Sequence, residues 1–174
     1  MPAPRFSEQL NLQIGNELAA HNQYLAVAVH YDAETMPRMA AFFYAQALEE
    51  RDHAMMMIQY LLDTDAEVVI PAVEATVSSF ADVIAPIKLA LEQEKRVTEQ
   101  INGLLRIARE ESDFASEQFL QWFIKEQVEE VATMTDLLAV VTRNADDIED
   151  IEEYVAREQG GGEADPTAPR IAGA

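Results

Sequence analysis

The chain has 174 residues, 49% of them hydrophobic, so it is long enough for one domain with a sizeable core. Its 32 acidic and 12 basic residues give a formal charge of −20, which argues against nucleic acid and anionic membranes as partners and favours cations. The absence of cysteine excludes disulfides, zinc–thiolate sites, iron–sulfur clusters and thiol catalysis.

The N-terminal segment MPAPRFSEQLN carries no apolar run behind a basic stretch, so it does not have the pattern of a secretory signal. Apolar runs elsewhere are shorter than the about 18 residues that a membrane span needs. We therefore expect a soluble, cytoplasmic protein.

Apolar residues recur at spacings of three and four along most of the chain, which is the pattern of amphipathic helices. We expect Ser7 to be the N-cap of the first of four long helices. The expected helices cover residues 7–35, 38–63, 81–111 and 114–143.

The connection between the second and third helices, residues 64–82, contains Pro71 and is unusually long for a compact domain. A crossover along a helix bundle explains this length. A short fifth helix follows over DDIEDIEEYVARE, and residues 159–174 have the Gly, Pro and Ala content of a flexible tail. The sequence thus predicts an all-α four-helix bundle with one long crossover and a short C-terminal helix, in a domain of residues 1–158 followed by the tail.

Each long helix carries one line of apolar residues toward the expected core, and polar groups interrupt each line near its middle. Mid-helix positions meet at one height in a bundle whose helices have similar lengths. We therefore expect the interrupting groups to converge on one central point. They are Glu17, Glu50, His53, Glu94, Gln127 and Glu130.

Carboxylates converging in a core repel one another and lose their hydration, and no Lys or Arg lies on the four lines to neutralise them. A bound cation is the simplest remedy. Oxygen ligands with one imidazole suit iron or manganese, and zinc is also compatible. Glu50 and His53 are one turn apart and can reach the same ion. The four carboxylates suit a pair of ions with a bridging carboxylate.

As a set, these residues and their neighbours resemble a non-haem prokaryotic ferritin over about residues 7–158. Actinobacterial members are the nearest match, in part because of the extended tail. The resemblance implies a ferritin-like fold. The matching features are Glu17 with Tyr24, EERDH at 49–53, Glu94, FLQWF at 119–123 and EQVEE at 126–130.

The resemblance also implies a di-iron centre. In it, Glu17, Glu50 and His53 correspond to the first iron site. Glu94 and Glu130 correspond to the second site, with Glu50 bridging the two ions.

A third iron site, which leads iron toward the mineral cavity of bacterial ferritins, is implied as well. It comprises Glu49, Glu126 and Glu129, with Glu130 shared. Gln127 lies beside the di-iron pair without a firm role as a ligand.

Aromatic residues near the centre complete the implied site. Tyr24 and Trp122 resemble aromatics that supply electrons during oxygen reduction. His21 lies one turn from Glu17, and we expect it to be a packed histidine rather than a ligand.

Two departures point away from bacterioferritins. The unit Gln127-x-x-Glu130 replaces the second Glu-x-x-His motif of many di-iron bundles. Arg51 stands where bacterioferritins carry their haem-binding methionine, so we expect no haem. The lack of cysteine also excludes the rubredoxin-like domain of rubrerythrins.

The function implied by the resemblance is iron storage by a ferroxidase. Fe(II) would be oxidised by dioxygen or hydrogen peroxide, and ferric mineral would accumulate inside a cage of 24 chains. The fifth helix would line the fourfold axes, and the crossover would pack at a twofold interface. The start of the fourth helix would line threefold channels, where Glu117 matches an acidic position and Leu120 does not.

Two alternatives remain open at this point. A di-iron oxidase or peroxidase would use the same centre without storing mineral. A helical interaction protein without metal would have only apolar residues on the core-facing line of each helix, whereas polar groups interrupt these lines here. The sequence leaves undetermined the preferred oxidant, the reductant that releases iron, the iron entry route, the role of the tail and the salt dependence of the cage.

Overall fold

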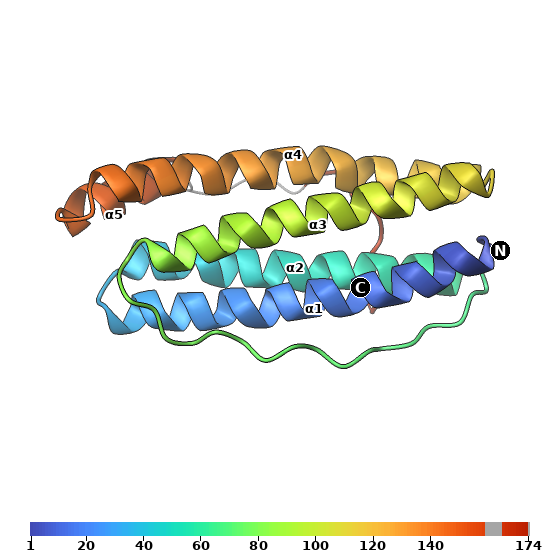
Figure 1. Ribbon diagram of the computed structural model, residues 1–174, viewed down its shortest axis with the longest axis horizontal. Coiled ribbons are helices and arrows are strands. Elements are labelled where there is room, and N and C mark those ends of the chain that lie inside the picture. The colour runs from blue at the N-terminus through green and yellow to red at the C-terminus, as the bar shows by residue number, and fades with distance from the viewer. Residues whose placement is uncertain (159–164, 174) are drawn as a thin grey trace.

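The computed structural model describes residues 1–158 and 165–173, and these form five helices without a strand (Figure 1). This confirms the all-α bundle with a long crossover and a short fifth helix. The elements are α1 (Pro4–Ala33), α2 (Pro37–Asp63), α3 (Ala85–Glu110), α4 (Phe114–Arg143) and α5 (Ile148–Glu158).

The start of α1 differs from the prediction, since Ser7 is not its N-cap. The helix begins at Pro4, with Ala3 in the capping position and no side-chain cap. Proline suits the first helical position because its φ is already helical and its missing N–H would have no partner there. The backbone N–H of Ala3 instead donates to Asp113 Oδ2 at 2.9 Å, which ties this end to the start of α4.

The third helix begins at Ala85 rather than at the predicted Ala81. The Asp82 carboxylate accepts hydrogen bonds from the backbone N–H groups of Ile84 (2.9 Å) and Ala85 (2.8 Å). This side chain satisfies N–H groups that a helix start leaves free, so the residues before it stay outside the helix.

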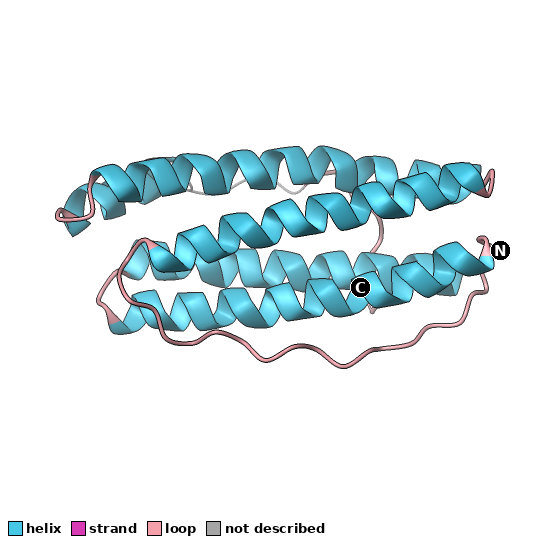
Figure 2. Cartoon of the chain, in the orientation of Figure 1, coloured by secondary structure: helices cyan, strands magenta, loops and turns pink. Residues whose placement is uncertain are grey.

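The crossover runs along the bundle as an extended loop beside α1 (Figure 2). Two amide side chains of α1 hold it. Asn11 Nδ2 donates to a crossover carbonyl, and its Oδ1 accepts from the Val69 backbone at 2.7 Å. Gln23 exchanges two 2.8 Å hydrogen bonds with the backbone of Val77. Between these points Pro71 packs directly against Gly15.

The buried apolar residues form two clusters, one toward each end of the bundle. One contains Tyr24 and Phe43, and the other contains Phe6 and Leu61. Each long helix contributes to both clusters and changes from one to the other near its middle. The buried polar residues of that middle layer include Glu17, Glu50, His53, Glu94, Gln127 and Glu130.

The short helix α5 packs across the end of the bundle through Ile151 and Val155, which are buried. Its Glu152 carboxylate accepts the backbone N–H groups of Arg38 (2.7 Å) and Met39 (2.9 Å). These are free N–H groups at the start of α2, so Glu152 acts as a remote cap for that helix.

Residues 165–173 lie along α2 and α4. The N–H of Ala172 donates to the Met55 carbonyl at 3.1 Å, and Arg170 pairs with Asp63 at 2.6 Å. The flexible tail over residues 159–174 stays a prediction, as does the domain boundary, and residues 159–164 and 174 lie outside the described residues. Among the described helices, none is long and apolar enough to cross a membrane.

Candidate metal centre

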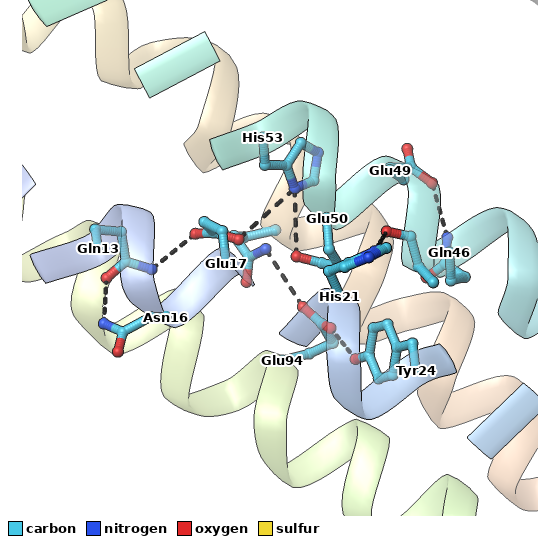
Figure 3. A network of polar contacts seen from close by, with 12 residues as sticks. Gln13, Asn16, Glu17, His21, Tyr24, Gln46, Glu49, Glu50, His53 and Glu94 are labelled. Carbon is cyan, nitrogen blue, oxygen red and sulfur yellow. Dashed lines mark hydrogen bonds and ion pairs between the residues drawn. The ribbon is translucent and has the colours of Figure 1, made fainter. Parts of the chain in front are cut away.

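The middle layer brings Glu17, Glu50 and His53 together from α1 and α2 (Figure 3). One ligand atom from each lies within 4.8 Å of the others. His53 Nδ1 is 3.6 Å from Glu50 Oε2 and 3.9 Å from Glu17 Oε2. The three side chains are at most 2% exposed, so these groups are removed from solvent.

On the opposite pair of helices, Glu94 is held by hydrogen bonds. The Tyr24 hydroxyl donates to Glu94 Oε1, and Gln127 Nε2 is 3.4 Å from Glu94 Oε2. The Thr98 hydroxyl donates to Gln127 Oε1 at 2.9 Å, which turns the amino group of that amide toward Glu94. Gln127 is therefore an orienting group in this geometry. Glu130 lies one turn further along α4 and is buried.

The electrostatics of this layer favour protons or cations. Burial, and then the charges of Glu94 and Glu17, raise the pKa of Glu50 well above its usual value. Burial and then Glu94 do the same to the pKa of Glu130. Burial raises the pKa of Glu94 to about 7, although the hydrogen bond from Tyr24 lowers it. Without a cation, these carboxylates retain protons that free glutamates lose.

Several buried ligand atoms have no hydrogen-bond partner within the described residues. Such atoms are costly in a core unless a ligand satisfies them. Carboxylate oxygens with one imidazole nitrogen form a donor set that fits iron or manganese. The unpartnered carboxylate and imidazole atoms of this layer are Glu17 Oε2, Glu50 Oε1, His53 Nε2 and Glu130 Oε2.

A second group of possible ligands adjoins the first. Atoms of Glu49, His53 and Glu126 lie within 4.8 Å of one another, and the two glutamates are half-buried. Burial, and then the charge of Glu49, raise the pKa of Glu126 to about 7. Glu129 is not part of this group; its side chain is 61% exposed and pairs with Lys125 at 3.6 Å. Two glutamates of the expected third site, Glu49 and Glu126, thus lie together with His53, whereas Glu129 lies outside this group.

Trp122 and His21 occupy different surroundings. The Trp122 ring packs edge-on against the His53 ring, with centroids 5.5 Å apart, and its Nε1 donates to Asp165 at 3.2 Å. His21 Nδ1 lies 2.6 Å from the Ala47 carbonyl oxygen and so links α1 to α2. His21 belongs to neither ligand group of the described residues.

Sequence reasoning missed two polar contacts of the centre. Gln13 Nε2 donates to Glu17 Oε1 at 2.7 Å, and Thr98 orients Gln127. Gln13 precedes Glu17 by four positions, and this spacing was the available signal, because such pairs are neighbours on a helix. The line of core-facing residues does not include Gln13.

Comparison with known proteins places this arrangement in a family. The ferritin family profile, described as a ferritin-like domain, matches residues 7–144. A ferritin BfrB from Mycolicibacterium smegmatis is 50% identical over 169 residues, covering 97% of this chain and 93% of that protein. A ferritin BfrB from Mycobacterium tuberculosis is 45% identical over 172 residues, covering 99% and 95%.

More distant relatives agree. A bacterial non-heme ferritin from Staphylococcus aureus is 38% identical over 140 residues, covering 80% of this chain and 84% of that protein. The solved open pore ferritin of Archaeoglobus fulgidus has a TM-score of 0.87 at 29% identity and covers 91% of this chain and 100% of that chain. The chain belongs to the ferritin family.

Proposed function

We propose that this chain is an iron-storage ferritin with ferroxidase activity at the centre of its bundle. Glu17, Glu50 and His53 would bind one Fe(II), and Glu94 and Glu130 would bind a second, with Glu50 between them. Each ion would give up one electron to dioxygen or hydrogen peroxide, and the carboxylates would stabilise the higher charge of Fe(III). The convergence of these buried groups from four helices is the observation that carries the proposal.

The other residues around the centre would position ligands and supply electrons. Tyr24 and Gln127 hold Glu94 through hydrogen bonds, so its orientation is set before iron arrives. Trp122 packs against His53 and, with Tyr24, would supply electrons to the oxidant. We propose that the chain binds no haem, because Arg51 stands at the position where bacterioferritins carry their haem-binding methionine.

Oxidised iron would leave through the neighbouring acidic group. Glu49 and Glu126 lie beside His53, which is also a ligand of the proposed first iron site, so the two groups of residues adjoin. Glu129, with Glu130, would extend this path toward the mineral. The path starts at a buried ligand and ends at an exposed carboxylate, which suits transfer out of the bundle.

We further propose that 24 chains form a cytoplasmic cage, with α5 at the fourfold axes and the crossover at a twofold interface. At the start of α4, Glu117 is paired with Arg109 at 2.8 Å, and Leu120 is fully buried in the core. Leu120 therefore faces the core of its own bundle. Of the two positions matched to the threefold channel, Glu117 is the acidic one.

Aerobic Fe(II) loading followed by gel filtration tests this function. Storage predicts a very large particle that retains far more than two iron ions per chain. A small species that stops near two ions per chain would leave a di-iron oxidase or peroxidase and rule out the cage. A chain that neither binds nor oxidises Fe(II) would contradict the whole proposal.

A further inference from the structure

A pair of amide side chains stands behind one of the proposed iron ligands. Gln13 is 2% exposed and donates from Nε2 to Glu17 Oε1 at 2.7 Å. Asn16 donates from Nδ2 to Gln13 Oε1 at 2.9 Å. Figure 3 shows these residues as one chain of contacts, Asn16 to Gln13 to Glu17, that leads to the centre.

The chemistry of the three groups fixes the direction of this chain. A carboxylate that ligates a metal ion can only accept hydrogen bonds, so the amino group of Gln13 must face Glu17, as it does in the structure. Its carbonyl oxygen then faces the amino group of Asn16. A flipped Gln13 amide would set two oxygens against each other at Glu17 and two amino groups against each other at Asn16. The Glu17 carboxylate therefore fixes the orientation of Gln13, and Asn16 satisfies the remaining oxygen of the Gln13 amide.

This contact makes the two oxygens of Glu17 unequal. Oε1 is occupied by the Gln13 amide. Oε2 is buried, has no hydrogen-bond partner among the described residues, and lies 3.9 Å from His53 Nδ1. Glu17 thus keeps one free oxygen on the side of His53 Nδ1, which also lies 3.6 Å from Glu50 Oε2.

We propose that Gln13, whose carbonyl oxygen is held by Asn16, is a positioning residue that makes Glu17 a one-oxygen ligand of the first metal ion. This inference rests on the proposed function, because it concerns the same centre. The second ion would depend on Glu94, which Tyr24 and Gln127 orient independently of Gln13. Loss of the Gln13 amide should therefore weaken the binding of the first ion and leave the binding of the second ion unchanged.

Stepwise binding of Co(II), a redox-inactive probe under anaerobic conditions, separates the two ions by their visible absorption. In Gln13→Met, which keeps the length of the side chain and removes the donor, the first Co(II) is expected to bind about tenfold more weakly. Gln93→Met is the matched control. Gln93 is also buried and lines the same groove between α1 and α3, and within the described residues its side chain makes no hydrogen bond to a proposed ligand.

A second variant tests orientation rather than packing. In Asn16→Asp the new carboxylate can only accept, so it competes with Glu17 for the single amino group of Gln13 and weakens the contact that holds Glu17. The expected result is weaker binding of the first Co(II) although Gln13 is still present. The added negative charge by itself favours cations, so charge does not explain such a weakening.

The positioning role would be overturned if Gln13→Met bound both Co(II) ions more weakly to the same extent. It would also be overturned if Gln13→Met bound the first Co(II) as tightly as Gln93→Met does. Wild-type oxidation of Fe(II), measured in parallel, separates the two proposals. If the wild type oxidises Fe(II) while Gln13→Met and Asn16→Asp bind the first Co(II) normally, the function stands and the positioning role is wrong. If the wild type binds no pair of Co(II) ions, both proposals fail. Should Gln13→Met not fold, Asn16→Asp alone decides the question.

Discussion

At the scale of single residues, the buried carboxylates that we propose to bind metal also lower the stability of the metal-free fold when they ionise. Glu50, Glu94 and Glu130 are buried among like charges, and both effects oppose ionisation. A cation replaces this repulsion with coordination and displaces the retained protons. The metal-free bundle should therefore be least stable at the pH values at which the centre is most able to bind metal.

Glu94 determines the direction in which the stability of the metal-free protein changes with pH. Its pKa is about 7 in the folded protein, against 4.5 for an ordinary glutamate, so between these values the folded state holds a proton that the unfolded chain has lost. Stability from this proton is complete below pH 4.5 and is lost as the pH rises through 7. Urea unfolding in chelator at pH 5 and pH 8 measures the loss.

The control for this prediction is Glu94→Gln, which removes the titrating group and keeps its shape. Between pH 5 and pH 8 the metal-free wild type should lose about 1–3 kcal/mol more than the variant. Parallel losses in the two proteins would show that Glu94 is not the group responsible.

At the scale of elements, the contact between the crossover and α1 depends on a residue without a side chain. A Cβ on Gly15 would lie 2.5 Å from Pro71 Cγ, so the crossover would have to move. Gly15→Ala should lower the free energy of unfolding by about 1–3 kcal/mol, because this overlap outweighs the gain in helix propensity.

Gly103 on α3 provides the matched control. A Cβ there meets only the end of the Arg106 side chain, at 3.8 Å. Gly103→Ala should therefore raise the free energy of unfolding by about 0.5–1 kcal/mol. Urea denaturation of both variants gives the comparison, and stabilisation by Gly15→Ala would contradict the close packing of the crossover.

The fluorescence of Trp122, the only tryptophan in the chain, reports whether the C-terminal residues 165–173 stay packed against the bundle. Its indole N–H donates to Asp165, and Trp122 and Ile171 both pack against the apolar cluster that contains Phe6 and Leu61. Deletion of residues 165–174 should expose the indole and shift its fluorescence emission to longer wavelength. Arg170→Ala removes an exposed ion pair further along and should leave the emission unchanged. An unshifted spectrum after the deletion would mean that the segment does not cover Trp122 in solution.

Helical periodicity predicted the long helices and the polar layer, because a residue that must face a core recurs at fixed spacing whatever its partner is. The Ser7 cap was wrong because proline at position 4 and a distant Asp113 decide where α1 begins. Gln13 was missed because it acts on a neighbour along the helix, away from the core-facing line. Asp165 was missed because its contact with Trp122 spans 43 positions and leaves no periodic trace.

At the scale of the whole molecule, exposed apolar side chains gather on α1 and the crossover. They include Leu25 (41% exposed), Val29 (54%), Ile70 (57%) and Val77 (48%). Such a surface is unusual on a monomer with a charge of −20 and suits contact with another copy of the chain. It supports the twofold interface that we propose for the crossover.

Ile70→Lys tests that interface. A buried lysine facing its symmetry copy would oppose association, so the variant should elute as a small species under conditions in which the wild type forms the large particle. Leu62→Lys alters a similarly exposed apolar residue, at the end of α2, and should assemble normally. A large particle from Ile70→Lys would place the interface elsewhere.

The division of the core into two apolar clusters also has a consequence for how the helices find their alignment. Uniformly apolar helices can slide past one another by a turn, about 5.4 Å, with little change in burial. Here such a slip would carry a carboxylate from the middle layer into an apolar cluster, where nothing compensates its charge. The proposed iron ligands therefore mark the register of the bundle, and the residues that we propose to bind metal also select one arrangement of its four helices.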